Sequence, residues 1–130
     1  YAPPSCFNED LMCVLGERRP PYRGLLIGAE RSGTTLHVDP LQTAAWNTLI
    51  SGRKRWVLFP PSAEAWRLHS PPGGNDSVAA FQVYDSAAHW LHWCYPALGD
   101  SVGGCLDFVQ EPGDTVYVPR GWWHNVVNLK

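Results

Sequence analysis

The sequence has few charged residues and almost no net charge. Aspartate, glutamate, lysine and arginine make up 17% of its 130 residues, and the formal net charge is −2. Domains that bind nucleic acid carry clustered positive charge against the phosphates, and this chain has no such excess. Charge therefore gives no support to a nucleic-acid partner. It leaves a protein or peptide rich in lysine and arginine open as a partner.

Three other features are missing. No apolar run approaches the roughly 20 residues that span a bilayer, so we expect no membrane segment. The opening "YAPPSCFNED" lacks the basic and apolar regions of a secretory leader and starts without methionine, so we expect a piece of a longer protein. The four cysteines form no CxxC pair and no zinc-finger spacing, which favours free thiols in an intracellular protein over two disulfides. They are Cys6, Cys13, Cys94 and Cys105.

Tryptophan and proline, in contrast, are plentiful, with seven and twelve residues. This composition favours strands and turns over helices. The length predicts one domain over residues 1–130. Within it we expect an irregular or helical lead-in at 1–23 and a barrel at 24–130, with a loop insertion at 70–77. Strand-rich ends around a central loop indicate an all-β barrel or sandwich.

Local patterns predict the individual elements. A hairpin turn at Ser51-Gly52-Arg53 is expected to join two of the strands. Asn8 is expected to cap the first helix. The predicted helices are 8–15, 62–69 and, from a weaker pattern, 77–93. The predicted strands are 24–29, 34–40, 43–51, 54–60, 105–110, 115–119 and 122–130.

His37 and Asp39 lie two residues apart in an extended segment. Side chains alternate along a strand, so both point to one face and could hold one side of a metal ion. His124 follows a strand and a Gly-Trp-Trp turn, and it is the candidate for a third ligand. Two histidines and one carboxylate on one face of an octahedral ion leave three positions open, as in non-haem Fe(II) oxygenases.

Each of these residues also has a purely structural interpretation. Asp39 before Pro40 fits a turn, and His124 fits a buried histidine whose hydrogen bonds are satisfied. A single HxD pair is a weak signal, and the set of three is what favours a metal site. His89 and His92 have the spacing of one helix face, but no carboxylate stands at a supporting position.

Polar residues interrupt the apolar strands near this pair. Alternation puts Lys54 on one face of its strand with Trp56 and Leu58, where an inward ammonium needs an anion. A dicarboxylate cosubstrate would supply one, whereas a lysine at the start of a strand could instead extend into water. Asn47 and Thr34 could bond a carboxylate or serve as ordinary structural polar groups.

Two blocks of the sequence resemble a known family. "RSGTTLHVDPLQTAAWNTLISGRKRWVLFPP" and "EPGDTVYVPRGWWHNVVNL" resemble the JmjC-domain Fe(II)/2-oxoglutarate-dependent oxygenases. Within them the chain is most similar to the bifunctional arginine demethylase and lysyl-hydroxylase subgroup, once called the phosphatidylserine receptor. The resemblance runs from "RRPPYR" to the last residue and is patchy through 63–104.

The resemblance implies a double-stranded β-helix, which is a jelly-roll or cupin-like barrel, with short peripheral helices. The family barrel continues past its second histidine, so we expect a fragment that lacks the last barrel strand. The resemblance implies that His37, Asp39 and His124 bind Fe(II). It also implies contacts to 2-oxoglutarate, with its distal carboxylate on Lys54. The residues implied for this cosubstrate are Lys54, Asn47, Thr34 and Asn128.

The implied activity is hydroxylation of a protein side chain. 2-Oxoglutarate would take two of the three open iron positions and O₂ the last, and oxidative decarboxylation would yield succinate and CO₂. Lysyl hydroxylation is favoured over removal of N-methyl groups from histones or other proteins. The alternatives are a catalytically inactive cupin-type binding module and a hydroxylase of RNA or a small molecule. The family resemblance favours a nuclear location, and the oligomeric state is not readable from the sequence.

Overall fold

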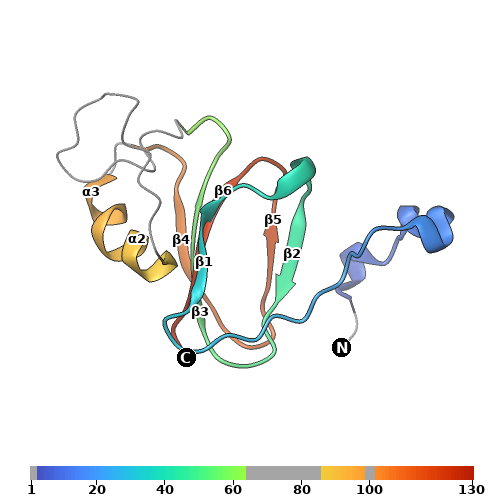
Figure 1. The fold of residues 1–130 in the computed structure, drawn as a ribbon, viewed down its shortest axis with the longest axis horizontal. Coiled ribbons are helices and arrows are strands. Elements are labelled where there is room, and N and C mark those ends of the chain that lie inside the picture. Colours follow the sequence, from blue (N-terminus) through green and yellow to red (C-terminus); the bar gives the residue numbers. More distant parts are fainter. Residues whose placement is uncertain (1–2, 64–85, 99–101) are drawn as a thin grey trace.

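Two antiparallel sheets face each other in the computed structural model of the chain, which describes residues 3–63, 86–98 and 102–130 (Figure 1). One sheet has four strands in the order β1-β6-β3-β4, and the other pairs β2 with β5. The strands are β1 (Gly33–His37), β2 (Ala45–Thr48), β3 (Lys54–Phe59), β4 (Leu106–Gln110), β5 (Thr115–Val118) and β6 (Trp123–Asn128). This architecture confirms the all-β prediction and agrees with a jelly-roll barrel.

The space between the sheets is an apolar core. Trp56 and Leu58 of β3 pack there against Val116 and Val118 of β5 and Val126 of β6. Because side chains alternate along a strand, the other residues of β3 point away from this core. The face of β3 that carries Trp56 and Leu58 is therefore the inner face of the barrel.

A second core covers the outer face of the larger sheet. Helices α2 (Ala87–Trp93) and α3 (Tyr95–Leu98) lie beside this face in Figure 1. Val57 and Phe59 pack there against Trp90 of α2 and against Cys94, the residue that follows the helix. The hydroxyl of Ser86 accepts a hydrogen bond from the backbone N–H of His89 at 3.1 Å, which caps the first turn of α2. The helix thus begins at a defined residue and keeps its apolar side on the sheet.

An ion pair between Arg55 and Asp107 also joins β3 to β4 on this outer face. Arg55 donates two hydrogen bonds to Asp107 at 2.9 and 2.7 Å, and the Tyr95 hydroxyl donates a third at 2.9 Å. The Arg55 hydrogen bond lowers the pKa of Asp107 below its ordinary value of 3.8. Asp107→Asn is expected to reduce the free energy of unfolding by about 1 kcal/mol at neutral pH, because the pair is half-exposed.

The pH dependence of this effect has a definite sign. A carboxylate with a lowered folded pKa stabilises the protein above its unfolded pKa, and the contribution disappears as the pH falls through the folded value. Urea unfolding of wild type and Asp107→Asn at about pH 7 and about pH 2 measures this. A difference of equal size at both pH values would contradict the assignment.

Most predicted strands are confirmed, with shorter bounds, but the predicted hairpin is wrong. β2 and β3, on either side of Ser51-Gly52-Arg53, lie in different sheets. The turn residues permit a chain reversal, but they do not choose the strand that β2 pairs with. Gly52 has a φ of 89°, and a Cβ there would lie 2.4 Å from the carbonyl oxygen of Lys130. Glycine is therefore needed because the connection passes tightly under the end of the chain.

The predicted buried strand at 24–29 is also wrong. The segment has no regular structure, and Leu25, Leu26 and Ile27 are 73%, 73% and 90% exposed. An apolar run is buried only where another element covers it, and among the described residues none does. In Figure 1 the segment runs past the ends of the strands before it enters β1.

The lead-in forms 3₁₀ helices rather than the predicted helix at 8–15. They are η1 (Ser5–Phe7) and η2 (Leu11–Arg18), and a third, η3 (Pro40–Gln42), follows β1. Asn8 does not cap the start of a helix, because it is the residue that ends η1, its backbone is helical rather than extended, and η2 begins after Asp10. α2 confirms the helical pattern at the end of 77–93. The predicted loop at 70–77 and nearly all of the predicted helix at 62–69 lie outside the described residues.

Three further expectations concern chemistry and topology. All four cysteines are free thiols, as predicted. No helix within the described ranges is both long enough and apolar enough to cross a membrane. The expectation that a further barrel strand is missing stays a prediction, and β6 itself is hydrogen-bonded to β1 on one side and to β3 on the other. β6 therefore lies inside the sheet, between β1 and β3, and its hydrogen bonds set the register of both strands.

Candidate metal centre and anion pocket

A bulge in β1 turns His37 toward His124. The register pairs Thr34 with Val126 and then His37 with His124, so β1 has one residue more than β6 over this stretch. Opposed residues of an antiparallel pair share a face, and the extra residue lets Leu36 join the outer core. The two imidazole rings lie 4.1 Å apart between centroids on the inner face.

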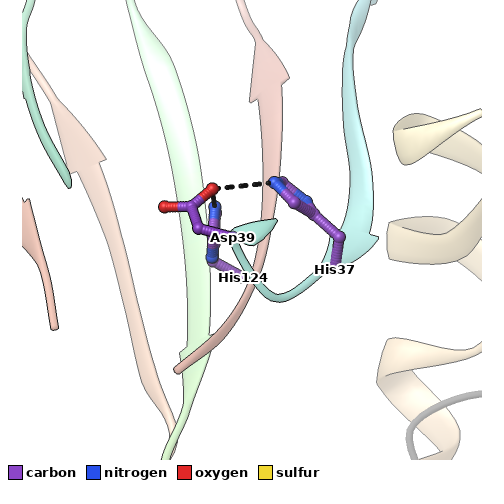
Figure 2. Close-up of side chains that lie close together, drawn as sticks. All are labelled: His37, Asp39 and His124. Atoms are coloured by element: carbon purple, nitrogen blue, oxygen red, sulfur yellow. Dashed lines mark ion pairs between the residues drawn. The ribbon is translucent and has the colours of Figure 1, made fainter. Parts of the chain in front are cut away.

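Asp39 completes the cluster from just beyond the end of β1. Its Oδ1 lies 3.5 Å from His37 Nε2 and 3.7 Å from His124 Nε2 (Figure 2). Pro40 favours an extended conformation in the residue before it, and Asp39 has a φ of −58° and a ψ of 139°. The other carboxylate oxygen, Oδ2, is buried and has no hydrogen-bond partner. No hydrogen-bond donor therefore stabilises the negative charge at this oxygen.

The hydrogen bonds of the two histidines decide which ring nitrogen is free. His37 Nδ1 lies 2.7 Å from the carbonyl oxygen of Thr35, and His124 Nδ1 lies 3.2 Å from that of Trp122. A carbonyl oxygen only accepts, so each Nδ1 carries the hydrogen and donates it. Each Nε2 is then left with its lone pair facing the cluster. This is how backbone groups orient histidine ligands in metal proteins.

Three acceptor atoms therefore converge with no hydrogen between them. Burial and the neighbouring His37 lower the pKa of His124, which keeps its imidazole neutral and able to coordinate. Bonds of about 2.1 Å meeting at right angles would put ligand atoms about 3 Å apart. The spacings here are somewhat longer, at 3.5 and 3.7 Å from Asp39 Oδ1 to the two histidine nitrogens and within 4.8 Å for all three atoms. The donor set fits a divalent metal ion, which would supply the missing positive charge.

No other group of this kind occurs in the part of the chain that the structure describes. The cluster His37, Asp39 and His124 is the one set of three histidine, cysteine or acidic residues whose ligand atoms meet there. His89 and His92 are both exposed on α2 and belong to no such set. The alternative histidine pair is therefore not supported.

Lys54 is an unpaired cation between two paired ones. Arg53 bonds Glu111 at 2.7 Å and Arg55 bonds Asp107 at 2.7 Å. Lys54 lies on the inner face with Trp56 and has no hydrogen-bond or ion-pair partner among the described residues. Partial burial lowers its pKa, with no neighbouring carboxylate to oppose the shift. Because a desolvated, unpaired ammonium is unfavourable, the position is suited to an anionic ligand.

The other three residues predicted to contact 2-oxoglutarate differ in whether their polar atoms are free to bind a ligand. Asn47 lies on the inner face of β2 opposite Val116, and its buried Oδ1 has no partner. Asn128 is opposite Lys54, but its amide nitrogen already donates to the hydroxyl of Ser32 at 2.9 Å. Thr34 is exposed on the inner face of β1. Asn47 is the best placed of the three, and Asn128 is partly committed to an adjacent turn.

A pocket of about 1190 Å³ opens around Lys54, Asn47 and Asn128. Glu111 is its one acidic lining residue among the described residues, and that carboxylate is already paired with Arg53. The basic lining residues are Arg23, Arg53, Lys54 and Lys130. The pocket therefore has a net positive lining and is suited to a carboxylate.

The metal cluster and this pocket lie toward opposite ends of the same pair of strands. In the register of β3 and β6, Leu58 is opposite His124, while Lys54 is opposite Asn128. None of the three clustered residues lines the pocket. A ligand that contacts both must therefore extend along the inner face of these strands.

Two residues of the site were not predicted from the sequence. The Trp56 ring stacks on the His124 imidazole at 6.2 Å between centroids, and Trp56 is 4% exposed. Its indole N–H donates to Oε1 of Gln110 at 2.8 Å, and Gln110 is 1% exposed. The alternation pattern placed Trp56 only on the same strand face as Lys54 and Leu58. No signal in the sequence marked Gln110.

Comparison with known proteins agrees with this geometry. Residues 7–130 match the family described as a cupin-like domain. The chain is 43% identical over its whole length to a lysine-specific demethylase, JMJ21, of Arabidopsis thaliana, of which it covers 14%. It is 37% identical over 98% of its length to the bifunctional arginine demethylase and lysyl-hydroxylase psr-1 of Caenorhabditis elegans, covering 32%.

A third relative is named by its chemistry. Over 84% of its length the chain is 31% identical to the 2-oxoglutarate and iron-dependent oxygenase JMJD4 of Danio rerio, of which it covers 24%. The chain therefore spans a third or less of each of these three relatives.

Proposed function

The chain belongs to the cupin-like domain family and to its JmjC branch, and on that basis we propose that it acts as an Fe(II)- and 2-oxoglutarate-dependent dioxygenase on a protein side chain. The observation that carries the proposal is the convergence of three acceptor atoms from His37, Asp39 and His124 with no donor between them. Unpaired Lys54 on the same inner face supports a carboxylate cosubstrate.

Each part of the site has its own task in this proposal. Iron, when bound, supplies the oxidative chemistry that converts 2-oxoglutarate and O₂ to succinate and CO₂ with hydroxylation of a C–H bond. His37, Asp39 and His124 would hold the metal from one side and leave its other positions free for ligands. Lys54 and Asn47 orient the distal carboxylate of the cosubstrate. Trp56 covers His124 and excludes water from that side of the cluster.

The substrate class follows from the relatives. One is named as a lysine-specific demethylase and another as a bifunctional arginine demethylase and lysyl-hydroxylase. We favour lysyl hydroxylation, with removal of N-methyl groups from lysine or arginine as the second form of the same reaction. In both forms oxygen is inserted at a C–H bond. Lysyl hydroxylation ends at the alcohol, whereas in demethylation the C–N bond of the hydroxylated N-methyl group then breaks to give formaldehyde and the amine with one methyl group fewer. A nuclear location stays a prediction.

Succinate formation tests the proposal. The full-length protein would be incubated under air with Fe(II), ascorbate and 2-oxoglutarate, with and without peptides that carry lysine or methylated arginine. We expect succinate release that rises with a substrate peptide and is lost in His37→Ala. A peptide that gains the mass of one oxygen indicates hydroxylation, and loss of a methyl group indicates demethylation. Succinate no higher than in His37→Ala would favour the binding module instead.

A further inference from the structure

Gln110, at the end of β4, has no spare hydrogen-bond donor. Its Oε1 accepts from the Trp56 indole at 2.8 Å, and its Nε2 donates to the carbonyl oxygens of Asn47 at 2.9 Å and Asp114 at 3.1 Å. An indole N–H only donates and a carbonyl only accepts, so the orientation of the amide is determined. One buried side chain thus ties β4 to β3, to β2 and to the turn before β5.

Gln110 is also directly opposite Lys54 in the register of β3 and β4. Opposed residues of an antiparallel pair point to the same face, with Cβ atoms about 5 Å apart. Gln110 is therefore one of the two immediate cross-strand neighbours of Lys54 on the inner face, and Asn128 of β6 is the other. Gln110 is neutral, and its amide is held by its three hydrogen bonds, so it does not pair with the Lys54 ammonium.

We propose that Gln110 is a positioning residue that sets the anion affinity of the pocket by keeping Lys54 unpaired. A carboxylate at position 110 would have nearly the same shape but would neutralise the lysine before a ligand arrived. The identity of the anion as 2-oxoglutarate rests on the proposed function. The availability of Lys54 rests on the cross-strand register and on the hydrogen bonds of Gln110.

The consequence of Gln110→Glu follows from these contacts. One carboxylate oxygen can still accept from the Trp56 indole. The other would face two carbonyl oxygens, those of Asn47 and Asp114, and would be repelled by both. Lys54 is the nearby group that can satisfy it, and opposite charges at close range in a partly buried site attract strongly. The lysine would then be occupied from within the protein.

Two substitutions at one position separate charge from structure. Gln110→Met also fills the space but removes all three hydrogen bonds and adds no charge. Binding of 2-oxoglutarate to the full-length protein loaded with Mn(II), which keeps the complex from turning over, would be measured by calorimetry. We expect affinity about tenfold or more lower in Gln110→Glu and within about threefold of wild type in Gln110→Met. Mn(II) affinity should change little in either variant.

A second measurement does not depend on the cosubstrate. The rate of Lys54 acylation by an amine-reactive ester would be followed by site-resolved mass spectrometry, with exposed Lys130 as internal reference. We expect Lys54 to react several-fold more slowly in Gln110→Glu than in wild type, because a neighbouring carboxylate favours its unreactive protonated form, while Lys130 is unchanged. Asp107→Asn, on the outer face of the same strand, is the matched control and should leave both rates and the binding unaltered.

The outcomes distinguish this inference from the proposed function. If wild type binds 2-oxoglutarate and Gln110→Glu binds it equally well, the inference is overturned. Equal weakening in Gln110→Met and Gln110→Glu would overturn it too, because the role would then be structural. If wild type binds no 2-oxoglutarate, the proposed function fails, and the acylation rates alone decide the role of Gln110.

Discussion

Asp39→Asn is expected to weaken binding of a divalent metal by at least about a hundredfold. Loss of a residue that only hydrogen-bonds to a metal ligand costs about ten- to a hundredfold in affinity, and loss of a ligand itself should cost more. The substitution keeps the shape of the side chain and removes the one negative charge among the three converging atoms. The metal-free protein should keep its free energy of unfolding within about 1 kcal/mol, because Oδ2 of Asp39 has no hydrogen-bond partner to lose. Calorimetric titration with Mn(II) measures the first effect, and urea unfolding without metal measures the second.

The two effects together separate a ligand from a structural carboxylate. A ligand to the metal stabilises only the loaded protein, so adding Mn(II) should raise the melting temperature of wild type and not of Asp39→Asn. Glu30→Gln, an exposed acidic residue outside the cluster, is the control and should respond to metal like wild type. Wild-type metal affinity in Asp39→Asn would show that the cluster is not the metal site. A large loss of metal-free stability would point to a structural role for Asp39.

Lys54→Ala is expected to raise the dissociation constant for 2-oxoglutarate by about ten- to a hundredfold. A hydrogen bond to a charged partner in a partly buried site contributes about 1.5–3 kcal/mol, which corresponds to that range. Metal affinity should stay within about twofold of wild type, since Lys54 lies toward the other end of β3 from the strand position opposite His124. Titration of the Mn(II)-loaded protein with 2-oxoglutarate tests this expectation.

Two further substitutions make the lysine result specific. Lys130→Ala removes a second basic residue that lines the pocket but lies at its exposed rim, and it should change 2-oxoglutarate affinity little. Lys54→Met removes the charge and keeps the length, so it should weaken binding as Lys54→Ala does. It should not lower stability, because no partner is left unpaired. If metal affinity fell in parallel with 2-oxoglutarate affinity, Lys54 would have to be assigned a structural role.

The features that depend on only a few neighbouring residues could be predicted from the sequence. Alternation in β3 placed Lys54 with Trp56 and Leu58, and the structure has these residues on the inner face. Short strands ended at glycine and proline turns, and most of them formed where the pattern indicated. These features depend on local backbone geometry, which a short stretch of sequence largely determines.

The failures concern partners that are distant in sequence. The residues Ser51-Gly52-Arg53 permit a turn but contain no information that β2 pairs with β5. The apolar run at 24–29 indicates burial but cannot reveal that no other described element covers it. The bulge that turns His37 inward depends on the register with β6, which no pattern within β1 specifies.

Gln110 is the clearest case among the site residues. It is one glutamine between Val109 and Glu111, and its three hydrogen bonds go to residues from separate parts of the chain. A polar residue in a strand ordinarily suggests a solvent-exposed position. Its role depends on the cross-strand neighbour Lys54 and on the surrounding carbonyl groups, whose positions no local pattern in the sequence specifies.

The pairing of β3 with β6 has a consequence for ligand length. Four residues separate His124 from Asn128 along β6, and the same interval separates Leu58 from Lys54 on β3. At about 3.3 Å per residue this corresponds to about 13 Å between the metal end and the lysine end. Hydrogen bonds hold the two strands in register, so this span between backbone positions is fixed. Under the proposed function, a dicarboxylate much shorter than this span joins the two ends only if the Lys54 side chain extends along the inner face toward the metal end.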